Sequence, residues 1–85
     1  MEIIFAPKAL ADIKYWKTTG NIRVQKKITE LLNSISTDPF KGIGKPEPLK
    51  NELSGCWSRR INQEHRLIYE IEDGKVYILS LKDHY

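Results

Sequence analysis

The sequence of 85 residues has little of several features that would point to particular classes of protein. Its single cysteine, Cys56, excludes an internal disulfide and is typical of a reducing compartment. No apolar run approaches the ~18 residues that a membrane span needs, and no signal-peptide pattern opens the sequence. We therefore expect a cytoplasmic protein with no membrane association.

Motifs for metals and nucleotides are also missing. The two histidines and the one cysteine show no zinc spacing, and no acidic cluster suits magnesium. Gly44-Lys45 resembles part of a phosphate-binding loop, but that motif requires glycine at position 39 and serine or threonine at position 46, where this chain has proline. We expect no metal and no cofactor.

The length predicts one small domain over residues 1–85. A net charge of +3 and a pI near 9.1 favour an anionic partner. Residues 1–45 hold eight Lys/Arg against four Asp/Glu, whereas residues 46–85 hold six against seven, so the basic surface is concentrated in the first half. Solvated helix faces explain this excess equally well.

The first half of the chain predicts a short strand and two helices. Residues 1–5 are a strand candidate, and a helix begins at Pro7 and ends before Gly20. Asn21 is a suitable N-cap for a second helix, which ends at Asp38 because a proline follows. The second helix has one apolar stripe at helical spacing, formed by Val24, Ile28, Leu31, Leu32 and Ile35.

The second half predicts three strands, at residues 56–62, 65–72 and 75–82. Asp73-Gly74 is a two-residue hairpin signal between the last two strands. That turn predicts three cross-strand pairs: Ile71 with Val76, Tyr69 with Ile78, and Arg66 with Leu81. The predicted fold is α+β, an antiparallel sheet with an N-terminal helical hairpin packed on one face.

Two stretches carry unusual side chains. Glu47 stands between two prolines, which restrict the backbone to extended forms and would present the carboxylate rigidly; an ordinary exposed acid in a turn is the alternative. Arginines recur in the strands at Arg59, Arg60 and Arg66, where aromatic and β-branched residues are more usual. We therefore expect an anion to bind there.

Several motifs occur together, namely Gly-Ile-Gly-Lys-Pro-Glu-Pro-Leu (42–49), Leu-Ser-Gly-Cys-Trp-Ser-Arg-Arg-Ile (53–61), Glu-His-Arg-Leu-Ile-Tyr (64–69) and the terminal His84-Tyr85. With these motifs the chain resembles, nearly end to end, the YoeB-type toxins of the RelE/ParE superfamily of bacterial toxin–antitoxin systems. One departure is Cys56, where the resemblance leads us to expect an aromatic residue, and it puts local packing in doubt.

The resemblance implies a RelE-like fold and a ribosome-dependent endoribonuclease that cuts mRNA in the ribosomal A site. It also implies a YefM-type antitoxin as partner, operator DNA bound only through the antitoxin complex, and a homodimer. The catalytic residues would be Glu47, Arg66 and His84, and the RNA-binding residues would be Lys50, Arg60 and Tyr85. Two alternatives on the same fold are a ParE-like gyrase inhibitor without nuclease activity and a regulatory module that only binds antitoxin.

The residue types suit metal-independent cleavage of RNA, which needs a base for the 2′-OH, an acid for the leaving oxygen and a cation for the phosphorane. Glu47 is the candidate base, His84 the acid and Arg66 the phosphate clamp, because a planar guanidinium stays charged and binds phosphate oxygens bidentately. Alternatively, Arg66 is a structural strand residue paired with Glu64 or Glu70, and His84 is simply a terminal residue.

The alternation of side chains along a strand restricts how these groups meet. A three-residue turn at 62–64 would place Arg60 and Arg66 on one face, whereas a two-residue turn would separate them, and we predict the three-residue turn. His84 can approach Arg66 only if the last strand bulges or leaves the sheet after about Leu81, and we predict that the C-terminal tail diverges there.

Overall fold

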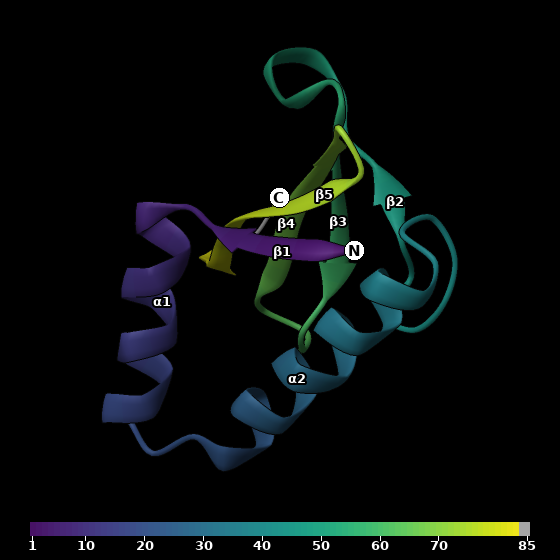
Figure 1. Cartoon of the computed structure of the whole chain (residues 1–85). Helices are drawn as coiled ribbons and strands as arrows, with labels where there is room; N and C mark the ends of the chain where they lie inside the picture. Colours follow the sequence, from purple (N-terminus) through teal and green to yellow (C-terminus); the bar gives the residue numbers. More distant parts are fainter. Residues whose placement is uncertain (84–85) are drawn as a thin grey trace.

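The structure is a computed structural model, which describes residues 1–83 (Figure 1). The elements follow one another as β1 (Glu2–Phe5), α1 (Pro7–Thr18), α2 (Ile22–Thr37), β2 (Glu47–Pro48), a 3-10 turn η1 (Asn51–Leu53), β3 (Cys56–Arg60), β4 (Arg66–Glu72) and β5 (Lys75–Asp83). None of the helices within residues 1–83 is long and apolar enough to span a membrane.

The strands form one sheet in the order β1-β5-β4-β3-β2. Strands β2 to β5 pair with one another antiparallel, whereas β1 runs parallel to β5, with Glu2 opposite Lys75 and Phe5 opposite Ile78. The predicted α+β fold is confirmed, and the parallel edge strand makes the sheet mixed rather than wholly antiparallel. A parallel pair needs a long connection between its two strands. Here the connection from β1 to β5 begins with the two helices.

The helices begin and end close to their predicted residues. The Asn21 side chain accepts a hydrogen bond from the Val24 N–H at 3.1 Å, so it caps α2 as expected. The apolar stripes of both helices pack on the same face of the sheet. The shared core consists of Ala9, Trp16, Val24, Ile28, Leu31, Ile35, Ile61, Leu67, Tyr69, Val76, Ile78 and Leu81.

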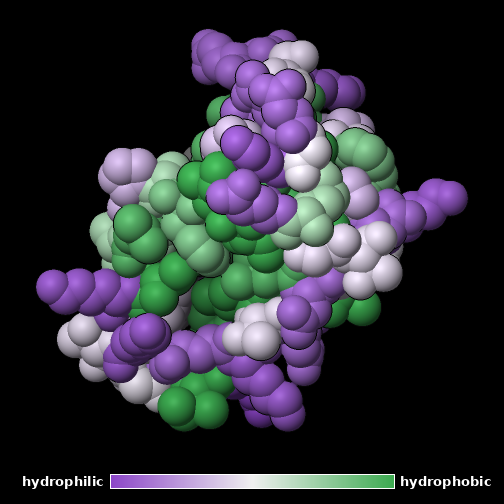
Figure 2. Space-filling model, in the orientation of Figure 1, coloured by the Kyte–Doolittle hydropathy of each residue, from purple (hydrophilic) through white to green (hydrophobic). Residues whose placement is uncertain are grey.

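The predicted helical hairpin is an open V rather than a closely packed pair (Figure 1). Between its arms lies a groove of about 180 Å³, lined on one side by Ile13 and Trp16 and on the other by Ile28 and Leu32. Figure 2 shows an apolar area between the helices with hydrophilic side chains around it. Part of the apolar surface of both helices therefore remains accessible.

The β4–β5 hairpin has the predicted pairs Ile71 with Val76 and Tyr69 with Ile78, but the prediction for Arg66 was wrong. Arg66 lies opposite Asp83 rather than Leu81, because the register shifts twice, between Arg66 and Ile68 and between Ile68 and Tyr69. Each shift adds one residue to β5, as in a β-bulge.

Helix α1 holds β5 at this irregular segment. The Leu81 N–H donates to the Asp12 carboxylate at 2.8 Å, and the Trp16 indole N–H donates to the Leu81 carbonyl at 2.9 Å. Strand β1 has already ended at Phe5, opposite Ile78, so these side chains bond backbone groups that β1 no longer reaches. The bulge is thus stabilised by residues that lie more than 60 positions away in the sequence.

Arg59 is fully buried, and its guanidinium uses all five of its N–H donors inside the protein. Its Nε donates to the Tyr69 hydroxyl at 3.1 Å and one Nη1 hydrogen to the Ser34 hydroxyl at 2.7 Å. The remaining donors bond the backbone carbonyls of Asp38, Lys41 and Ile43. No donor is left for an external anion, so the expectation of an anion was wrong for Arg59.

Two glycines allow the loop after α2 to close around this arginine. A Cβ at Gly42 would collide with the Ser34 hydroxyl, and one at Gly44 would lie 2.6 Å from Leu31 Cδ2. Both glycines also have positive φ, +128° and +82°, which other residues adopt only with strain. The loop can therefore approach α2 and β3 only because these positions have no side chain.

We predict that Arg59→Met lowers the free energy of unfolding by at least about 3 kcal/mol, because it leaves several buried acceptors without a donor. Arg60→Met is the matched control: Arg60 is the next residue of β3 and is exposed, so its replacement should change stability by about 0.5 kcal/mol or less. Urea unfolding measures both values. Equal effects of the two substitutions would contradict the structural role of Arg59.

Candidate active site

Three predicted site residues share the face of the sheet that points away from the helices. Leu67 and Tyr69 of β4 belong to the core, so the alternating residue Arg66 points to the opposite face. Arg60 of β3 lies directly opposite Arg66, and Glu47 of β2 lies opposite Ser58, two positions before Arg60. Glu47, Arg60 and Arg66 are therefore brought to one surface from three adjacent strands.

Arg66 is the centre of this surface. Its Nη1 lies 3.9 Å from Glu47 Oε1 and 3.5 Å from the Ser58 hydroxyl. The side chain of Glu47 is 56% exposed and that of Arg66 is 21% exposed, so the guanidinium is largely enclosed while the carboxylate can reach a ligand. Both groups are close enough for one small group, such as a phosphodiester, to contact them together.

The alternative partners proposed for Arg66 are engaged elsewhere. The Glu64 carboxylate lies 3.3 Å from His65 Nε2, and the Glu70 carboxylate lies 4.0 Å from the Cys56 sulfur. Among the side chains of residues 1–82, the one carboxylate within ion-pair distance of Arg66 is that of Glu47. The interpretation of Arg66 as a strand residue paired with Glu64 or Glu70 is therefore not supported.

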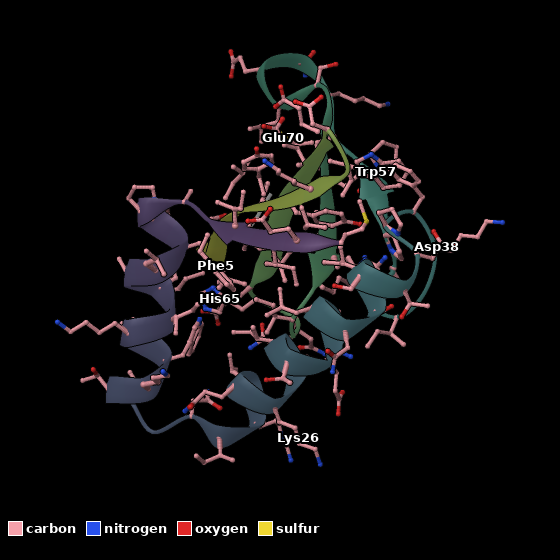
Figure 3. All side chains as sticks on the ribbon, in the orientation of Figure 1. Phe5, Lys26, Asp38, Trp57, His65 and Glu70 are labelled. Carbon is pink, nitrogen blue, oxygen red and sulfur yellow. The ribbon has the colours of Figure 1, made fainter. Side chains whose placement is uncertain are left out.

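The predicted three-residue turn at 62–64 is confirmed by the register that places Arg60 opposite Arg66. The Asn62 side chain accepts hydrogen bonds from the N–H groups of Glu64 and His65, at 2.9 and 2.7 Å. The His65 ring packs edge-on against Trp16, with 5.1 Å between ring centroids, on the side of α1 (Figure 3). His65 thus joins the turn to the helices, and it does not face the site.

The position of Glu47 depends on the loop that Arg59 holds. The Gly44 carbonyl accepts a hydrogen bond from the Arg60 N–H at 2.6 Å, and the Leu49 N–H donates to the Cys56 carbonyl at 2.9 Å. These bonds flank Pro46 and Pro48 and fix the short strand β2 along β3. The proline-braced carboxylate is consequently an edge-strand residue and not an acid in a loose turn.

Of the three remaining predicted site residues, the structure describes Lys50 alone. Lys50 is exposed and lies between β2 and η1. His84 and Tyr85 lie outside the described residues. Ser58, buried beneath Arg66, was missed, although its position two residues before Arg60 in a strand places it on the same face. No group of metal-ligating side chains occurs among the residues that the structure describes.

Cys56 also points to this face, where it is 8% exposed. Burial raises the pKa of its thiol, and the nearby Glu70 carboxylate raises it further. A thiol in this environment is a small packing group and a poor nucleophile at neutral pH. The departure at Cys56 therefore places a small, buried side chain on this face.

A five-stranded mixed sheet with two N-terminal helices on one face is the fold of the RelE/YoeB-type toxins. The chain belongs to the family of YoeB-like toxins of bacterial type II toxin–antitoxin systems, whose profile matches residues 5–85.

Individual relatives agree along the whole chain. Toxin YoeB of Escherichia coli K12 is 46% identical over 85 residues, which cover all of both chains. The YoeB dimer from Staphylococcus aureus has a TM-score of 0.90 at 48% identity, with all of this chain and 98% of that one covered. The YoeB–YefM complex from the same organism has a TM-score of 0.89 at 49% identity and the same coverage.

We predict that the Cys56 thiol of the native protein reacts with a thiol reagent such as DTNB at pH 8 at least about tenfold more slowly than in urea. The raised pKa leaves less thiolate than an ordinary cysteine has at this pH, and burial restricts access. Because Cys56 is the one cysteine of the sequence, the absorbance change reports it alone. Equal rates in the native and the unfolded protein would contradict the predicted environment.

Proposed function

We propose that the protein is a ribosome-dependent endoribonuclease that cleaves mRNA in the A site and so inhibits translation. The observation that carries this proposal is the pairing of Glu47 and Arg66 on the open face of the sheet, 3.9 Å apart, with the carboxylate exposed. A carboxylate and a guanidinium at this separation can contact a 2′-OH and the adjacent phosphate of one nucleotide. Only RNA has a 2′-OH, so the arrangement also selects the class of substrate.

In the proposed reaction, Glu47 removes the proton of the 2′-OH, and the resulting oxygen attacks the neighbouring phosphorus. Arg66 stabilises the negative charge that develops on the phosphorane oxygens, through its charged and nearly enclosed guanidinium. The bond to the 5′-oxygen then breaks, and an acid protonates this leaving group. The products are a 2′,3′-cyclic phosphate on one fragment and a 5′-hydroxyl on the other.

We assign the acid to His84 and a contact with the substrate to Tyr85, on the basis of the family motif. The register brings the end of β5 next to Arg66, because the Cα of Asp83 is the partner of Arg66 across β4–β5. Since direct cross-strand partners share a face, the assignment requires the chain to leave the regular strand after Asp83. His84 follows immediately in the sequence. Lys50 and Arg60 are proposed to hold RNA on either side of this centre.

The requirement for the ribosome follows from the openness of the site. A solvated carboxylate is a weak base for a sugar hydroxyl unless the substrate is packed around it. Glu47 lies at the exposed edge of the sheet, where the protein alone cannot hold a mobile strand in line for attack. Positioning of the mRNA by the ribosome would supply orientation, which in general contributes about 7–11 kcal/mol.

The partners proposed for this chain follow from its relatives. The S. aureus YoeB is found in a complex with YefM and also as a dimer. We propose a YefM-type antitoxin as the cognate inhibitor, operator DNA binding only through that complex, and a homodimer of the toxin. We place this system in the cytoplasm, where ribosomes and mRNA are available.

We predict that Glu47→Gln or Arg66→Gln reduces mRNA cleavage in a reconstituted translation reaction by about 100-fold or more, because each removes a group that acts on the reacting atoms. His84→Gln should have an effect of similar size. The matched control is Glu52→Gln, an exposed glutamate of η1, which should cleave at the rate of the unchanged protein.

Mapping of the cut ends tests the mechanism directly. Mass spectrometry of the fragments should find a 2′,3′-cyclic phosphate at the codon in the A site. Full activity of both Glu47→Gln and Arg66→Gln would rule out the assigned roles. Intact mRNA together with stalled gyrase would instead favour the non-catalytic, ParE-like alternative.

A further inference from the structure

A basic cleft of about 390 Å³ lies beside the candidate active site, at the end of β3. It is formed by Lys27 of α2, Gly44 and Lys45 of the loop before β2, Arg60 of β3, and residues 61–63 of the turn. Three cationic side chains thus converge on it from three separate segments, and no carboxylate belongs to its lining.

These three cations form no ion pair with the described side chains. Within residues 1–82, the ion pairs involve Lys8, His65 and Arg66, and none of them includes Lys27, Lys45 or Arg60. The one acidic residue of α2, Glu30, does not line the cleft, although it borders a neighbouring hollow together with Lys27. With three cations and no carboxylate in its lining, the cleft presents a positive potential.

Lys45 is held in the cleft by an unusual backbone. Its φ is +53°, in the left-handed region that non-glycine residues seldom adopt, and this strain is maintained by the bond between the Arg60 N–H and the Gly44 carbonyl. Residues held in such conformations cluster at active sites and ligand-binding segments. The backbone conformation of Lys45 places this residue at the border of the cleft, next to Arg60.

Arg60 connects the cleft with the candidate active site. It lines the cleft and also lies directly opposite Arg66 in the β3–β4 ladder. Like charges at directly opposed positions destabilise an antiparallel pair, so the two arginines carry a cost that a bound anion between or beside them would relieve. A strand with regularly spaced negative charges could contact both places at once.

We propose that this cleft binds a phosphodiester group of the substrate RNA strand, next to the one that is cleaved, with Lys27 and Lys45 as its contacts in addition to Arg60. The inference rests on the proposed nuclease function for the identity of the strand. The continuity through Arg60 favours the substrate over ribosomal RNA, which offers the same phosphate chemistry. Lys27 and Lys45 are thus positioning residues that hold the strand in register with Glu47 and Arg66.

The test uses a short single-stranded RNA with 2′-O-methyl groups, which the protein cannot cut, and fluorescence anisotropy over a salt titration. Lys27→Gln should weaken binding about three- to tenfold at low salt and reduce the slope of log K against log salt by about 0.7, the value for one phosphate contact on a single strand. Lys45→Asn should change the affinity and the salt slope by similar amounts, because asparagine removes the charge and tolerates positive φ.

Lys26→Gln is the matched control. It removes the same charge from the neighbouring residue of α2, but Lys26 is exposed on the outer side of the helix (Figure 3) and does not line the cleft. Its RNA affinity should stay within about twofold of the unchanged protein. Lys27→Arg keeps the charge at the half-buried position and should retain binding, which separates loss of charge from loss of folding.

Two results would overturn the inference. Equal weakening by Lys26→Gln and Lys27→Gln would mean a diffuse positive surface rather than a cleft. If Lys27→Gln bound the oligonucleotide as well as the unchanged protein but bound purified ribosomes more weakly, the cleft would be assigned to ribosomal RNA. Because neither measurement needs cleavage, failure of the proposed nuclease activity would be seen separately, as RNA binding by the cleft without cut mRNA.

Discussion

The guanidinium of Arg59 bonds Tyr69, Ser34 and three carbonyls of the loop after α2, and the geometry of the site depends on this set of contacts. The loop has no regular structure of its own, so its inward carbonyls would otherwise be buried without donors. Tyr69 adds a further contact to this set, because its hydroxyl donates to the Pro39 carbonyl at 2.7 Å. Burial raises the pKa of this phenol. The loop, fixed by these bonds, positions β2 and the Glu47 carboxylate at the edge of the sheet.

Two consecutive arginines of β3 illustrate how one residue type serves opposite purposes on the two faces of a sheet. Arg59 points into the protein and is fully satisfied there, whereas Arg60 points out with no internal partner among the described residues. The buried cation organises the chain, and the exposed cation is available to a ligand. Because side chains alternate along a strand, Arg59 points into the core and Arg60 points to the open face.

Much of the fold could be predicted because it is encoded locally. The helices follow from apolar spacing and the Asn21 cap, and the pairs near Asp73-Gly74 follow from the turn. The position of Arg66 opposite Asp83 could not be predicted, because the bulges depend on contacts of β5 with Asp12 and Trp16, which are distant in sequence. Likewise, a buried arginine and a ligand-binding arginine look alike in a sequence, so Arg59 was misread while the face shared by Arg60 and Arg66 was predicted from the turn.

The parallel pairing of β1 with β5 has a consequence for the synthesis of the protein. Strand β5 is the last strand of the chain, yet it lies between β1 and β4, so the first strand has no partner until the last one has been made. Contacts of such long sequence separation form late, because the loop that joins them must first be closed. A nascent chain therefore cannot complete its sheet until β5 has been synthesised and has paired with β1.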